Sequence, residues 1–125
     1  MAADNRCSSK NKPKVNGIRG MEYSEDQGGC MISWSYSNII SIWNPNNSLN
    51  RPYIGKYEGH NGIVCCGKFC HKSPSCISID DKNFVRIWEV KAFTTIQVFH
   101  VDQTTALINT LLVLNDDNIV VCAKR

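Results

Sequence analysis

Four cysteines and one histidine lie between residues 65 and 76, in the run CCGKFCHKSPSC. Thiolate and imidazole are ligands that zinc prefers, and a thiol can also carry redox chemistry. Cys70, His71 and Cys76 could meet around a turn, but they supply three ligands where a structural zinc site needs four, and paired C-x₂-C knuckles are missing. A small zinc-binding or redox-active cysteine module on these three residues is therefore the alternative hypothesis.

The residues on either side of this run favour a plainer interpretation. Cys65, Cys66 and Cys70 fall on one expected strand, residues 71–75 form a tight turn, and Cys76 begins the next strand. Successive side chains on a strand face opposite ways, so Cys65 and Cys66 cannot converge on one ion, and only one of them should face the core. We therefore expect these cysteines to pack as small core residues, with no metal and no cofactor.

The composition is that of a soluble globular domain, with 42% hydrophobic and 20% charged residues in a chain of 125. The net charge of +3 comes without a basic stripe on folded segments, which argues against nucleic acid as a partner. No apolar run approaches the roughly 20 residues that cross a bilayer, so no membrane is expected. The N-terminus has no apolar signal segment, and seven cysteines make an odd number, which together predict thiols in a cytoplasmic, reducing compartment.

Enzyme motifs are missing from the sequence. It contains no glycine-rich phosphate loop, no nucleophile elbow and no His-Glu metal helix. The expectation is a protein without catalytic activity. Residues 1–16 are polar and aperiodic, and we expect them to be a disordered tail.

An internal repeat is the most informative pattern in the chain. At an offset of 45 residues, Ile18 aligns with Ile63 and Ile32-Ser33 aligns with Ile77-Ser78; Ile42-Trp43 aligns with Ile87-Trp88. Self-similarity at such a period indicates a repeat architecture. Each unit divides into short β-rich runs separated by Gly, Asn, Asp and Ser turns. The expected strands are Ile18–Tyr23, Cys30–Ser35, Ile39–Trp43 and Pro52–Tyr57, then Ile63–Cys70, Cys76–Ile79, Phe84–Val90 and Thr95–Phe99, and finally Leu107–Val113 and Ile119–Ala123.

The segment from Glu58 to Val90, EGHNGIVCCGKF…CISIDDKNFVRIWEV, resembles a unit of the WD-repeat family of β-propellers, with Gly-His opening the unit and Ile-Trp closing its third strand. The resemblance implies a hydrogen-bonded tetrad, which falls here on His60, Ser78, Asp81 (or Asp80) and Trp88. The first unit departs from the pattern because it has neither the Gly-His pair nor a turn aspartate. GIRGMEYS and SIWNPNN further resemble blades of large WD-repeat proteins of cilia and the cytoskeleton.

The resemblance implies an all-β fold of about two and a half four-stranded propeller blades that does not close on its own. The expected division is a tail at 1–16, a first blade at 17–57, a second blade at 58–99 and the first two strands of a third blade at 100–125. The expected function is a non-enzymatic scaffold for protein partners in a larger assembly of the cytoplasm, with the cytoskeleton or cilium as the finer expectation. The remaining blades would be supplied in cis or in trans, and the contacts by the loops Asn44–Asn50, His71–Ser75 and Lys91–Thr94.

Overall fold

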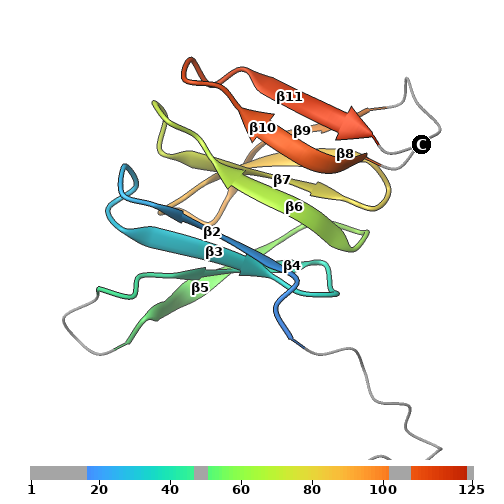
Figure 1. Cartoon of the computed structure of the whole chain (residues 1–125). Coiled ribbons are helices and arrows are strands. Elements are labelled where there is room, and N and C mark those ends of the chain that lie inside the picture. Colours follow the sequence, from blue (N-terminus) through green and yellow to red (C-terminus); the bar gives the residue numbers. More distant parts are fainter. Residues whose placement is uncertain (1–16, 47–50, 102–107, 124–125) are drawn as a thin grey trace, which may run out of the picture.

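A computed structural model describes residues 17–46, 51–101 and 108–123 of the chain, which form strands and turns (Figure 1). The expected tail at 1–16 lies outside the described residues. The first sheet contains four antiparallel strands in sequential order: β2 Gly20–Ser24, β3 Cys30–Trp34, β4 Ile39–Trp43 and β5 Tyr53–Glu58. The second sheet repeats this order with β6 Val64–Phe69, β7 Ser75–Asp80, β8 Phe84–Glu89 and β9 Thr95–His100. The third sheet pairs β10 Ile108–Val113 with β11 Ile119–Ala123.

Each strand expected from the sequence is present, with bounds that differ by at most two residues. The repeat is visible in the irregularities of the sheets as well. The pairing of β4 with β5 shifts between Ile42 and Trp43, and the pairing of β8 with β9 shifts between Ile87 and Trp88, at equal repeat phase. A bulge adds local twist to a strand. The two sheets therefore share a local irregularity at the same repeat position.

Two apolar cores hold the three sheets together. The first core lies between the first and second sheets, and the second lies between the second and third sheets. Strand β7 contributes to both of them, since Cys76 packs in the first core and Ile77 and Ile79 pack in the second. All six residues of β7 are buried. The outermost strand of the same sheet, β9, has no residue in the buried class.

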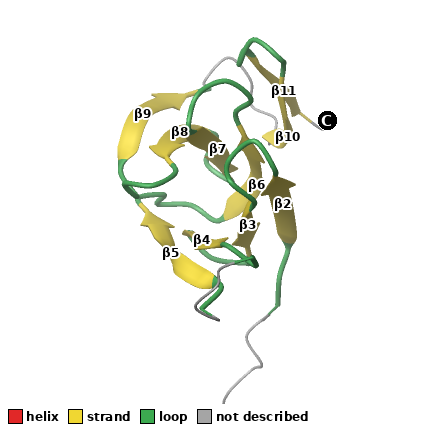
Figure 2. Ribbon diagram, turned by 90° about the vertical axis from the view of Figure 1, so that its left-hand side faces the viewer, coloured by secondary structure: helices red, strands yellow, loops and turns green. Residues whose placement is uncertain are grey.

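The first strands of the three sheets lie side by side, with β6 in contact with both β2 and β10. Figure 1 shows the sheets stacked through these strands, and Figure 2 shows the strands fanning outward from them to β5 and β9. We call the end of the stack that carries the β2–β3, β6–β7 and β10–β11 turns the hairpin rim. The end that carries residues 35–38 and 81–83 is the opposite rim.

Side chains on the hairpin rim join one sheet to the next. Gln27 donates from Nε2 to the carbonyl oxygens of Cys70 (3.1 Å) and Ser73 (2.8 Å), which ties the first sheet to the second. Asp117 accepts from the backbone N–H groups of residues 71, 72 and 73 at 2.7, 3.2 and 3.0 Å, which ties the second sheet to the third. Partial burial acts to raise the pKa of the Asp117 carboxyl, but these N–H bonds outweigh it and hold the pKa below its ordinary value.

The expectation for Cys65 and Cys66 is wrong. The pairing of β6 with β7 shifts between Val64 and Cys66, so Cys65 lies in a bulge and strict alternation of side chains fails there. Both thiols are half-buried and pack against the second core. A bulge depends on the register of two strands, which the sequence of one strand does not specify.

The described sheets do not close into a ring, which needs about four or more blades. This architecture confirms the all-β, unclosed fold expected from the sequence. No helix in the described ranges is long and apolar enough to cross a membrane.

Candidate functional site

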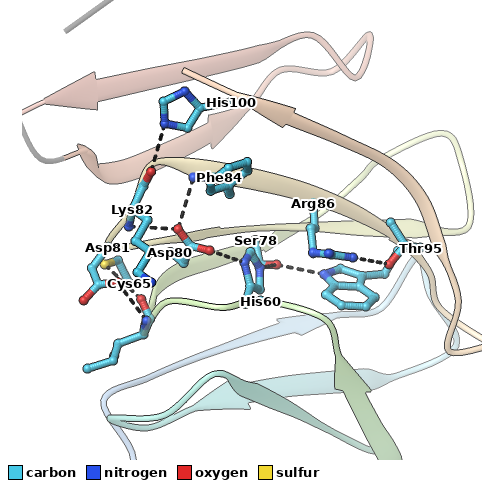
Figure 3. Close-up of polar contacts among 12 residues, drawn as sticks. His60, Cys65, Ser78, Asp80, Asp81, Lys82, Phe84, Arg86, Thr95 and His100 are labelled. Atoms are coloured by element: carbon cyan, nitrogen blue, oxygen red, sulfur yellow. Dashed lines mark hydrogen bonds and ion pairs between the residues drawn. The ribbon is translucent and has the colours of Figure 1, made fainter. Parts of the chain in front are cut away.

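A buried polar network lies on the face of the second sheet that packs against the first sheet (Figure 3). His60 comes from the connection between β5 and β6, Ser78 and Asp80 from β7, and Trp88 from β8. His60 Nδ1 lies 2.8 Å from Asp80 Oδ2, and His60 Nε2 lies 2.6 Å from Ser78 Oγ. Trp88 Nε1 donates to Ser78 Oγ at 2.8 Å. The four side chains form one continuous chain of hydrogen bonds.

The glycine before His60 explains how the connection enters this network. A Cβ on Gly59 would lie 2.6 Å from an Arg86 guanidinium nitrogen and 3.1 Å from the Trp88 ring. A side chain at this position would displace the Arg86 guanidinium and crowd the Trp88 ring, and the φ of +158° is one that residues with a Cβ rarely adopt, so glycine suits the position. The two residues of the Gly-His pair therefore have separate roles. The glycine lets the backbone lie close to Arg86 and Trp88, and the histidine makes the hydrogen bonds to Ser78 and Asp80.

The carboxylate of the network is Asp80, and the assignment to Asp81 is wrong. Strand β7 continues through residue 80, so alternation places Ser78 and Asp80 on one face. Asp80 Oδ1 also accepts from the N–H groups of Lys82 (2.9 Å) and Phe84 (3.1 Å), which fixes the following turn. Asp81 is exposed and accepts from the N–H of Ile63 at 2.9 Å instead. The spacing of two residues between Ser78 and Asp80 was the sequence signal that identifies the correct acid.

Burial sets the protonation state of His60. Desolvation lowers the pKa of the imidazole, and the Asp80 carboxylate opposes this shift without cancelling it. A neutral ring has one N–H and one acceptor nitrogen. Because a carboxylate only accepts, the N–H belongs to Nδ1, facing Asp80, and Nε2 accepts from the Ser78 hydroxyl. Ser78 Oγ then accepts from Trp88, so each group in the network has a partner.

The order Asp–His–Ser is also that of a hydrolytic triad, in which the histidine takes the proton of an attacking serine. Access decides between the two roles. His60 is 2% exposed, and Ser78 and Asp80 are 0% exposed. The Ser78 oxygen is already engaged by the Trp88 indole, so no acyl group can approach it. The arrangement can stabilise the sheet, and it has no path for a substrate.

The first sheet contains half of the same network. Trp43 Nε1 donates to Ser33 Oγ at 2.9 Å, which repeats the contact between Trp88 and Ser78. At the offset of 45 residues, the place of Asp80 is taken by Ser35, and the place of His60 by Val15, which lies outside the described residues. A cavity of about 400 Å³ adjoins this pair and is lined by Ser33, Ser35 and Trp43 together with neighbouring residues.

The structure does not bring the proposed zinc ligands together. Cys70 packs in the second core and Cys76 in the first, on opposite sides of the second sheet. His71 is exposed and donates from Nε2 to the carbonyl of Val113 at 3.0 Å. Burial raises the pKa of the Cys76 thiol far above its ordinary value, which keeps it protonated and unreactive. Among the described residues, no group of three metal-ligating side chains converges.

The loops expected to supply contacts all belong to the hairpin rim, apart from residues 47–50, which are outside the described ranges. Sequence reasoning missed Gln27 and Asp117, which hold the loop His71–Ser75 in place. A polar residue at the tip of each hairpin turn was the available signal. It is weak, because polar residues are common in turns for many reasons.

No family model matches the chain. A solved structure, the crystal structure of the WD40 β-propeller domain of Doa1, is similar over 88% of this chain with a TM-score of 0.70 and 22% sequence identity. The match covers 34% of that chain, so the present chain spans about a third of the structure it resembles. The likeness confirms the fold inferred from the repeat, a partial WD-repeat propeller.

Proposed function

We propose that this chain is a non-enzymatic scaffold for protein partners, an arc of a WD-repeat propeller that works within a larger assembly. The observation that carries the proposal is the fixed stacking of the sheets, by two apolar cores and by hydrogen bonds across the hairpin rim. Loops anchored in this way keep their positions relative to one another. A rigid set of loops is the property that a binding platform needs.

The polar chemistry of the chain supports the same function. The Ser–His–Asp arrangement is sealed inside the second sheet, and the thiol of Cys76 is buried. Partner proteins would meet the rims and the outer strands instead, where apolar side chains are exposed. Four such side chains lie on β5 and β9: Tyr53, Ile54, Ile96 and Val98.

Further blades, in cis or in trans, complete the arc in this proposal. The face of the first sheet that points away from the second sheet carries the half-buried Trp43 and the 400 Å³ cavity beside it. The corresponding face of the second sheet, around Trp88, is covered by the first sheet. By repeat symmetry, the face around Trp43 suits another blade.

The finer proposal is a cytoplasmic assembly of the cytoskeleton or the cilium. Its support is the resemblance of GIRGMEYS and SIWNPNN to blades of large WD-repeat proteins of those structures. Imaging the tagged protein tests it. Signal along cilia or microtubules is the expected result, and a signal confined to another compartment rules it out.

Site-specific photo-crosslinking in cells tests the scaffold function. A photoreactive residue is placed at Lys91 on the hairpin rim, at Ile96 on the outer strand, or at Lys82 on the opposite rim, all of them exposed. We expect discrete protein adducts from at least one of these positions, with native protein migrating in a large complex. A free monomer that gives no adduct from any position refutes the proposal.

A further inference from the structure

A cleft opens between the first and second sheets on the hairpin rim. Its volume is about 360 Å³, and its apolar lining includes Cys30, Ile42, Ile54 and Phe93. Ile54 is 41% exposed and Phe93 is 37% exposed, so part of this apolar surface faces solvent. Ligand pockets in proteins range from about 300 to 1,000 Å³. A cleft at the lower end of that range suits one or two side chains of a peptide.

Phe93 has a backbone conformation that aromatic residues rarely adopt. Its φ is +59°, which lies in the left-handed region. Bulky residues are strained there, whereas glycine and asparagine are accepted. The ring packs over Gly55, where a Cβ would approach it to 2.9 Å, and lies 5.8 Å from the Tyr57 ring. Strain retained at an exposed aromatic residue points to a role for its ring, because a smaller residue would fit the backbone better.

Lys91 gives the cleft its charge. It is the one ionised side chain among the residues that line the cleft, it is exposed, and no ion pair in the described part of the chain engages it. Burial raises the pKa of the Cys30 thiol, and the Lys91 ammonium opposes that shift, which places the positive charge close to the apolar wall. An apolar cleft beside a free cation complements an apolar side chain next to a carboxylate.

We propose that this cleft docks a peptide segment of a partner protein, taking one large aliphatic or aromatic side chain against Phe93 and Ile54 and a neighbouring aspartate or glutamate on Lys91. The inference rests on the proposed scaffold function and specifies the chemistry of its partner. A single buried anchor with one charge contact is typical of short recognition segments.

Selection from a library of random peptides displayed on phage tests the proposal, with the full chain immobilised as bait. We expect enrichment of peptides with an apolar residue beside an acidic one. The variant Lys91→Glu should bind these peptides with an affinity lower by about tenfold or more. When the same library is selected on this variant, we expect peptides with an apolar residue beside a basic one. Lys82→Glu is the matched control, because it makes the same charge change on the opposite rim and should have no effect.

Phe93→Asn separates docking from folding. Asparagine fits the positive φ, so the variant should unfold at a temperature close to that of the wild type while its peptide affinity falls by about tenfold or more. Unchanged affinity in both Phe93→Asn and Lys91→Glu overturns the cleft proposal, as does a selection without apolar–acidic enrichment. If crosslinked adducts persist in both variants, the proposed scaffold function is retained and only the proposal that the partner binds in this cleft is rejected.

Discussion

Ser78 and Ser33 occupy the same position in two successive repeats, and their substitution by alanine tests the role of the buried network. In the second sheet, Ser78→Ala removes both the acceptor of the Trp88 indole and the donor to His60 Nε2. In the first sheet, Ser33→Ala removes only the acceptor of Trp43. The two substitutions delete the same hydroxyl from the same strand position, so each is the control for the other.

The expected costs follow from what each change leaves unpaired. A buried polar group without a partner costs about 1–3 kcal/mol. Two such groups in Ser78→Ala predict a loss of about 2–6 kcal/mol in the free energy of unfolding. The Trp43 indole is only half-buried, so water can replace the lost acceptor and Ser33→Ala should cost about 0.5–1.5 kcal/mol.

Urea denaturation followed by far-ultraviolet circular dichroism measures both variants. This signal reports mainly on the backbone of the strands, whereas tryptophan fluorescence would report directly on the indoles that the substitutions alter. Ser78→Thr keeps a hydroxyl and should recover part of the lost stability, which separates the hydrogen bonds from side-chain volume. Equal losses in Ser78→Ala and Ser33→Ala, or no recovery by threonine, would refute the idea that the complete network is what stabilises the second sheet.

Three further predictions concern protonation, the hairpin rim and close packing. The pKa of His60 is lowered from 6.5 in the folded chain, so the unfolded chain binds the proton at a higher pH than the folded chain does. Thermal stability should therefore fall as the pH decreases from about 7 to 5.5, and His60→Gln should flatten this profile. Asp117→Asn removes a charged acceptor from three N–H groups, and hydrogen exchange at residues 71–73 should accelerate, while unchanged exchange contradicts the rim contact. Gly20→Ala places a Cβ against the Trp34 indole and should cost about 1–3 kcal/mol in a denaturant melt; a loss near zero means that the indole has room to move.

The repeat made much of the fold predictable from the sequence. Ile42-Trp43 and Ile87-Trp88 at equal phase located the third strand of both sheets, and the strand bounds followed from the turns between them. The same phase aligned Ser33 with Ser78, the two serines that accept from the tryptophan indoles. These features are local, since they depend on residue type and spacing within one unit.

The errors arose where one strand or sheet depends on another. The choice of Asp81 over Asp80 depended on how far β7 continues, which is decided by its pairing with β6 and β8. The bulge at Cys65 is a property of two strands in register, and no pattern within β6 reveals it. The contacts of Asp117 with residues 71–73 join segments more than forty residues apart through backbone groups, which every residue type provides.

The double burial of β7 has a consequence for how such a chain can diverge. Neighbouring positions of this strand pack in different cores and all six are buried, so few residue types are acceptable at any of them. Exposed positions of β9 and of the hairpin rim are not constrained by packing in a core. Amino-acid replacement over evolutionary time should therefore concentrate at the outer edge of each sheet. New binding preferences can arise there while the backbone of the inner strands changes little.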